Sequence, residues 1–241
     1  MLDDMTVLRD AAAGYRAAAT AAGIVWLDPV DPSGGPPPDL VYRLCDVDHV
    51  AGQLTWLYAQ GWISRRLLPE GAYLLPWPAD LDETLNSLHF SVGTPFPWRQ
   101  QLPLLRHESI VYTFVLEGDR EGEIWRYENE PDAWASVRAA ISLAALFTEW
   151  TKGIDAGVVA YDHHAGWLQV GRDSHDPFNA ILDRAPGLDP LAFPVSALSN
   201  EPLLRSRQRD CGVDMNCIDR GFDCYEELLD AIDATRASLR T

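Results

Sequence analysis

Two short runs of imidazole and carboxylate side chains are the residues of this sequence best suited to catalytic chemistry. Asp162, His163 and His164 are consecutive, and His175 directly precedes Asp176. Imidazole nitrogens and carboxylate oxygens are common ligands of Zn²⁺ and other divalent ions. Asp162, His163, His164 and His175 are therefore the candidate metal ligands, and a metal-dependent hydrolase that uses the three histidines is one function that the sequence leaves open.

The same residues also have an ordinary structural interpretation. Asp162, His163 and His164 separate two apolar segments, so they fall at the expected turn of a hairpin, where polar side chains are common. Asp176 precedes Pro177, a pair typical of a helix N-cap followed by a first-turn proline. The sequence has no G-x-S-x-G elbow, Walker loop, Rossmann fingerprint or H-E-x-x-H motif. We therefore favour a protein without catalytic residues or a cofactor over an enzyme.

The cysteines and the start of the sequence indicate a protein of the cytoplasm. Met1 is followed by Leu2, Asp3 and Asp4, without the basic and apolar segments of a secretory signal. In a reducing compartment the cysteines stay as free thiols. Their spacing does not match the paired C-x2-C units of common zinc sites, and we expect no zinc at the four positions Cys45, Cys211, Cys217 and Cys224.

The charge of the chain restricts its partners. Asp and Glu number 36 against 19 Lys and Arg, which gives a formal net charge of −17 and a sequence pI near 4.5. Such a chain repels nucleic-acid phosphates, whereas it attracts a basic protein over a distance. No apolar run reaches the ~20 residues needed to cross a membrane. A basic protein is therefore the expected partner, with neither nucleic acid nor membrane, although the acidity is also consistent with a role in solubility alone.

The acidic residues are concentrated in one segment. Seven of them lie within residues 117–132, where the basic residues are Arg120 and Arg126. The predicted partner-binding residues are these seven together with the aromatic Trp98, which lies in a proline-flanked loop: Glu117, Asp119, Glu121, Glu123, Glu128, Glu130, Asp132 and Trp98. The alternative is a solvated hairpin rim whose charges keep a sheet edge from aggregating.

Periodicity and capping residues define the elements that must position these side chains. Apolar residues at helical spacing predict helices near residues 3–22, 46–60, 80–88, 142–154, 176–185 and 225–239. Runs of β-branched and aromatic residues predict strands at 110–116, 123–127, 158–161 and 167–170. The stretch between the last two helices contains prolines and is expected to be irregular. On the 123–127 strand, one face is expected to meet the core.

The order of three of these elements resembles that of a known family. The residues are Tyr112–Asp119, a strand that ends in an acidic Gly-Asp turn, then the strand Gly122–Tyr127, then Ser142–Trp150, a serine-capped helix. This block, within residues 109–154, resembles the SUKH superfamily, which includes fungal cell-wall synthesis regulators and many bacterial immunity proteins. The resemblance implies a mixed sheet flanked by helices and a binding module without known catalysis.

Together these observations predict an α+β fold with a mixed or antiparallel sheet flanked by helices. We expect a SUKH-like domain over residues 1–165 and a helical C-terminal extension over 166–241, packed on the same core or separate. The expected function is protein binding, as an immunity protein or regulator that blocks a basic partner. A third possibility is a regulatory scaffold that docks through Leu228, Leu229 and Ile232 of the last helix. The oligomeric state is left open.

Overall fold

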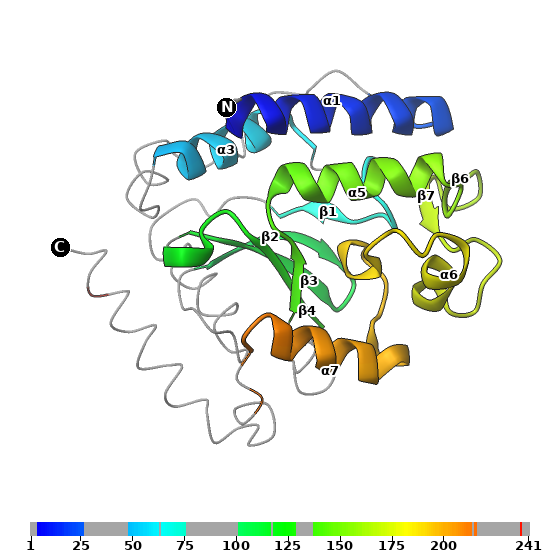
Figure 1. The fold of residues 1–241 in the computed structure, drawn as a ribbon. Helices are drawn as coiled ribbons and strands as arrows, with labels where there is room; N and C mark the ends of the chain where they lie inside the picture. Colours follow the sequence, from blue (N-terminus) through cyan, green and yellow to red (C-terminus); the bar gives the residue numbers. More distant parts are fainter. Residues whose placement is uncertain are drawn as a thin grey trace.

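A computed structural model describes residues 4–26, 48–62, 64–75, 101–116, 118–128, 137–213, 215 and 237. Over these residues the chain has an α+β fold in which an antiparallel sheet is flanked by helices, as the sequence predicts (Figure 1). The helix expected at 80–88 lies outside the described residues. So does the one at 225–239, Ala237 excepted, and Leu228, Leu229 and Ile232 fall there too.

The larger sheet is a five-stranded meander in which each strand pairs antiparallel with the next. Its strands are β1 (Tyr73–Leu74), β2 (Gln101–His107), β3 (Ile110–Val115), β4 (Ile124–Glu128) and β5 (Val137–Ala140). β3 and β4 confirm the predicted strand pair, and Tyr112 stands opposite Arg126. The second predicted hairpin is also present, as β6 (Val159–Asp162) and β7 (Trp167–Val170).

Five helices and three 3-10 turns lie in the described part of the chain. They are α1 (Asp4–Ala22), α3 (Asp48–Ala59), η1 (Gly118–Arg120), α5 (Leu143–Asp155), α6 (Pro177–Arg184), η2 (Pro190–Ala192), η3 (Leu198–Asn200) and α7 (Glu201–Asp210). The predicted caps are confirmed, because Ser142 accepts a hydrogen bond from the Ala145 N–H and Asp176 accepts one from the Asn179 N–H. These side chains satisfy N–H groups that the first helical turn leaves unpaired.

α1 and α5 lie side by side, and α5 lies between α1 and the sheet (Figure 1). Their contact contains Tyr15, Phe147 and Trp150, whose ring centroids are 5.5 to 5.8 Å apart. The Tyr15 hydroxyl donates to the Leu67 carbonyl at 2.7 Å, which satisfies its polar atom inside the core. Trp150 is fully buried, as its place on the apolar stripe of α5 predicts.

The described residues from 166 to 213 pack on the same core as the residues before them. Residue 165 itself lies in the turn between β6 and β7, so the expected domain boundary falls inside a hairpin. In η2, the Ala192 carbonyl accepts hydrogen bonds from the Tyr112 hydroxyl of β3 and the Trp150 indole of α5. This segment therefore joins the sheet to α5, and the described part of the extension belongs to one core.

Four elements and one face differ from the sequence prediction. α7 occupies part of the stretch that is expected to be irregular, and no strand is predicted at the positions of β1, β2 and β5. Asn200 caps α7 by accepting from the Leu203 N–H, with Pro202 in the first turn, so a local helix signal is present there. β4 is buried at every residue and not on one face only.

Candidate partner-binding surface

The predicted acidic site lies at the tip of the β3–η1–β4 hairpin. Gly118 and Gly122 have φ values of 77° and 79°, a left-handed conformation that glycine adopts without strain. The Gly122 N–H donates to the Val115 carbonyl at 2.9 Å and thereby closes the tip. Asp119 is exposed and Glu121 is half-buried, and neither carboxylate forms an ion pair with another described residue. Of the described residues in the predicted site, Asp119 and Glu121 are the ones whose carboxylates are open to a partner.

Glu123 is instead bound within the hairpin and its neighbour β5. Its Oε2 accepts from the Trp125 indole N–H at 2.7 Å and lies 3.4 Å from Nη1 of Arg120. Its Oε1 accepts from Nη1 of Arg138 at 2.8 Å. The side chain of Glu123 is 14% exposed. This carboxylate therefore holds the base of the tip in place, and both of its oxygens already have donors inside the chain.

Glu128 does not lie on the surface at all, because it belongs to a buried ion pair. Its side chain is 2% exposed, and its Oε1 accepts from Nη2 of Arg126 at 2.7 Å and from the Ala197 N–H at 2.7 Å. Oε2 accepts from the Ser196 hydroxyl at 2.7 Å. Arg126 completes the arrangement by donating to the carbonyls of Phe193 and Val195, each at 2.8 Å. The pair fastens residues 193–197 to the sheet.

Strand alternation explains why these carboxylates differ. Residues 124, 126 and 128 point to the side of β4 that residues 193–197 cover, whereas residues 119–122 lie beyond the strand. Arg126 and Glu128 have opposite charges and lie two positions apart, on one face of a strand. This spacing is the feature of the sequence that could have indicated an internal pair. The other predicted contact residues, Glu117, Glu130, Asp132 and Trp98, lie outside the described residues.

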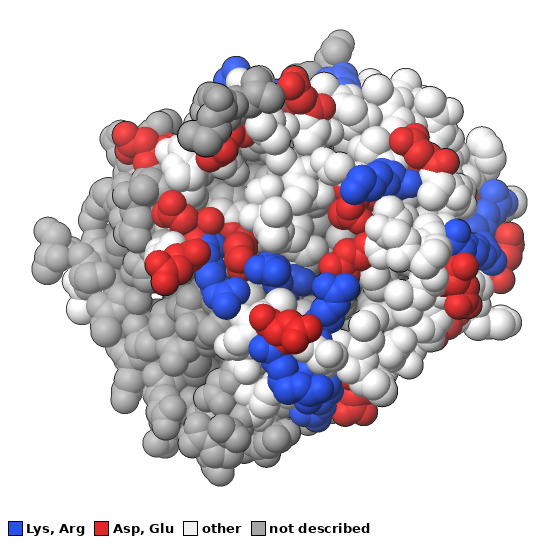
Figure 2. All heavy atoms as spheres, viewed as in Figure 1, with Lys and Arg blue, Asp and Glu red and all other residues white. Residues whose placement is uncertain are grey.

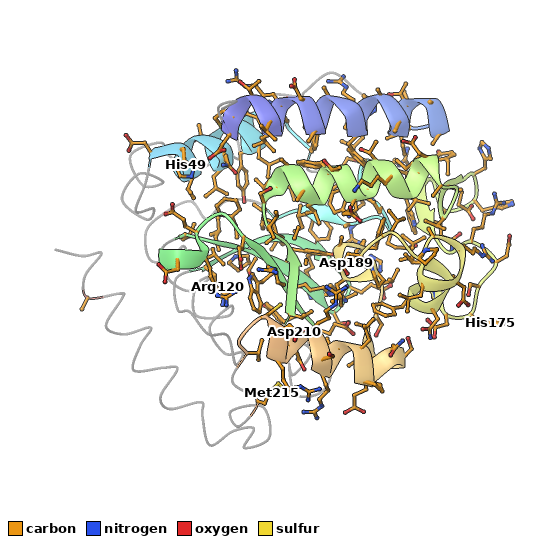
Figure 3. All side chains as sticks on the ribbon, in the orientation of Figure 1. His49, Arg120, His175, Asp189, Asp210 and Met215 are labelled. Carbon is orange, nitrogen blue, oxygen red and sulfur yellow. The ribbon has the colours of Figure 1, made fainter. Side chains whose placement is uncertain are left out.

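A row of charged side chains that the sequence does not predict lies on the face of the molecule shown in Figure 2. Figure 2 shows basic and acidic side chains side by side across its middle. Glu149 of α5 pairs with Lys152 at 2.7 Å and accepts from the backbone N–H of Asp189, whose carboxylate lies 3.5 Å from Arg207 of α7. In Figure 3, Asp189 lies between α5 and α7. Burial raises the pKa of Asp189, which the nearby Arg207 opposes.

The candidate metal ligands do not meet. Asp162 accepts from the N–H groups of His164 and Ala165, and these hydrogen bonds lower its pKa. The ring of His163 packs edge-on against Tyr161, while His175 is exposed before α6 at the edge of the molecule (Figure 3). Among the residues that the structure describes, no three His, Cys, Asp or Glu side chains are placed to hold a metal ion. Asp162 thus has the turn-forming role that its position indicates.

A shallow groove of about 530 Å³ lies at the C-terminal ends of α5 and α6, with Lys152, Asp155 and Leu188 among its lining residues. None of the predicted site residues lines it. Of the cysteines, Cys211 is buried with a free thiol, and the other three lie outside the described residues.

No protein-family model, no curated protein and no solved structure matches the chain. Within the described ranges, no helix has the length and apolar character required to cross a membrane.

Proposed function

We propose that this protein is a non-catalytic binding module that captures a basic partner protein through the tip of the β3–η1–β4 hairpin. The observation that carries the proposal is the state of Asp119 and Glu121: both are at the tip, and neither pairs with another described residue. Their charge is therefore available to a cationic partner. The net charge of −17 supports the same proposal, since it attracts a basic protein before contact.

The construction of the tip favours binding. Glu123 is fixed by hydrogen bonds from Trp125 and Arg138, and these bonds restrict the movement of the adjacent backbone that carries Asp119 and Glu121. A site that is ordered before binding loses less conformational entropy when the partner arrives. The protein would then act by covering a functional surface of its partner and excluding other molecules from it.

The resemblance to the SUKH superfamily supports a more specific role. Members of that superfamily include bacterial immunity proteins, which bind and block toxins. We therefore propose that the chain is an immunity protein or a regulator of this type, that it works in the cytoplasm, and that the blocked partner is a basic protein. The α+β fold with an antiparallel sheet flanked by helices is consistent with this role.

Charge reversal at the tip tests the proposal. In the double variant Asp119→Lys/Glu121→Lys we expect capture of the basic partner to fall at least about tenfold at low salt, because both tip carboxylates are replaced by side chains that carry the same positive charge as the partner. The measurement is affinity capture from an extract of the source cells, followed by titration of the captured basic protein at two salt concentrations.

A matched control separates local contact from total charge. Asp155→Lys/Asp183→Lys makes the same change in net charge at exposed residues of α5 and α6. α6 and η1 lie at opposite ends of the view in Figure 1. The control should retain its partner. Equal weakening by both double variants would show that only net charge matters, and unchanged binding by the tip variant would overturn the proposal.

A further inference from the structure

The turn at residues 69–72 connects the two sheets of the molecule. The Ala72 N–H donates to the Pro69 carbonyl at 3.0 Å, and the central residues Glu70 and Gly71 have φ values of 56° and 65°. On one side, Pro69 forms a bridge with Leu168 of β7. On the other side, the chain continues into β1 of the five-stranded sheet. The position of the β6–β7 hairpin relative to the large sheet therefore depends on this turn.

Glutamate is an unusual residue at this place in the turn. Two consecutive positive φ values are typical of a type I′ turn, which favours asparagine or glycine at both central positions because other side chains are strained there. Two hydrogen bonds between Glu70 and β7 offset this strain. Its N–H donates to the Leu168 carbonyl at 2.7 Å, and its carboxyl Oε1 accepts a hydrogen bond from the Val170 N–H. An asparagine side chain is shorter by one methylene group and has less reach toward Val170.

Among the described residues, no cation pairs with the carboxyl group of Glu70. It is mostly buried, and it forms no ion pair with any described Lys, Arg or His. The strand that it contacts, β7, consists of Trp, Leu, Gln and Val, so it has no titratable side chain. The turn between β2 and β3 adds a second negative charge nearby, that of Glu108. Burial and Glu108 therefore disfavour the ionised carboxyl, whereas the hydrogen bond from the Val170 N–H favours it.

The remaining charged groups around the turn have other partners. His107 of β2 is hydrogen-bonded to the Glu70 backbone, and burial lowers its pKa, which disfavours its charged form. Arg65, on the same segment as Glu70, lies over the ring of Tyr73. Arg106 of β2 donates to the Glu108 carbonyl. Arg126 of β4, the other cation within reach of His107, is bound to Glu128 and to residues 193–197.

We propose that Glu70 is a proton-controlled clasp that fastens the β6–β7 hairpin to the five-stranded sheet, closed when its carboxyl is protonated and looser when it is ionised. A neutral carboxyl can stay in the buried position and still accept from the Val170 N–H. An ionised carboxyl gains by moving toward water, away from Glu108, and the N–H of Val170 then loses its partner. The clasp thereby makes the mobility of the hairpin depend on pH.

The direction of the pH effect follows from the two states of the carboxyl. Burial raises the pKa of Glu70 to about 7 in the closed form, whereas an opened form returns it toward the ordinary glutamate value. Because the closed form has the higher pKa, it is favoured at low pH, and this advantage is lost as the pH rises through about 7.

Amide hydrogen exchange and NMR titration of the whole chain test the clasp. We expect the protection factor of the Val170 amide, corrected for its intrinsic exchange rate, to fall by about tenfold between pH 6 and pH 8. The chemical shift of the same amide should titrate with a midpoint of about 7. In Glu70→Gln, which keeps the acceptor oxygen but cannot ionise, both quantities should stay constant over this range.

Two further variants make the test specific. Glu108→Gln removes the neighbouring negative charge, so it should move the midpoint of the Val170 titration to lower pH while the titration itself persists. Glu70→Asn suits the positive φ value of the turn, and it should remove the titration. A Val170 titration that survives in Glu70→Gln would belong to another group, such as His107, and would overturn the proposal. So would a protection factor that is independent of pH in the unmodified chain.

Discussion

Replacing Arg126 with methionine is expected to lower the free energy of unfolding by about 4 kcal/mol. Methionine keeps much of the side-chain volume but leaves the buried carboxylate of Glu128 without its cation. The carbonyls of Phe193 and Val195 also lose their donor, so the segment that joins the sheet to α7 is released. Urea unfolding, followed by tryptophan fluorescence, measures the change.

Two comparisons identify the cause of this loss. Arg138→Met removes an arginine whose side chain is 35% exposed where it pairs with Glu123, and we expect a cost below about 1 kcal/mol. In Arg126→Met/Glu128→Gln, a neutral amide replaces the unpaired carboxylate and still accepts from the Ala197 N–H. This double variant should recover at least about 1 kcal/mol of the loss. If Arg126→Met cost no more than Arg138→Met, the buried pair would not have the role assigned to it.

Two helical glycines are expected to respond in opposite directions to the same substitution. Gly153→Ala places a methyl group in α5, where the new Cβ would lie 2.7 Å from the ring of Phe193 and 2.9 Å from a methyl of Val159. Overpacking of this kind costs about 1–3 kcal/mol, which exceeds the gain of up to about 1 kcal/mol that alanine brings to a helix. We therefore expect Gly153→Ala to destabilise the protein by about 1–2 kcal/mol.

Gly14→Ala in α1 is the matched control. Apart from the adjacent residues and the backbone of α1 itself, no atom of the described residues lies within 4 Å of the Cβ that alanine would add there. Only helix propensity acts at this site, and we expect a stabilisation of about 0.5–1 kcal/mol. Thermal unfolding of both variants compares the two effects directly. Stabilisation by both substitutions would mean that residues 153 and 193 are not in close contact.

Local signals in the sequence are sufficient to predict some elements of the fold. α5 was predicted from its Ser142 cap and its apolar stripe, and α6 from the Asp176-Pro177 pair, because these signals act within one or two turns of the helix. The β3–β4 hairpin was predicted for a similar reason, since its strands are adjacent in the chain. β2 gave a weaker signal, because Pro103 and a change of register interrupt its alternation.

Local signals do not predict whether a given carboxylate is exposed, paired within the chain or buried. In the sequence, Asp119, Glu121, Glu123 and Glu128 belong to one acidic segment, which predicts that all of them contact a partner. The structure leaves Asp119 and Glu121 at the tip, binds Glu123 to Arg138, and buries Glu128 against residues 193–197. Glu123 meets Arg138 on the next strand, 15 residues along the chain, whereas Glu128 meets Ser196 and Ala197 across 68 and 69 residues.

The sequence by itself determined the fold class, most of the helices, two hairpins and the concentration of negative charge near β4. Each of these follows from the composition or from contacts between near neighbours in the chain. Only the tertiary structure decided which charged side chains are paired inside the protein and which can contact a partner. Arg126, for example, meets its carbonyl partners across 67 and 69 residues. The same holds for Glu70 and Val170, which are 100 residues apart. A local pattern specifies how the backbone folds, but burial and hydrogen bonding of a charge depend on whatever segment packs against it.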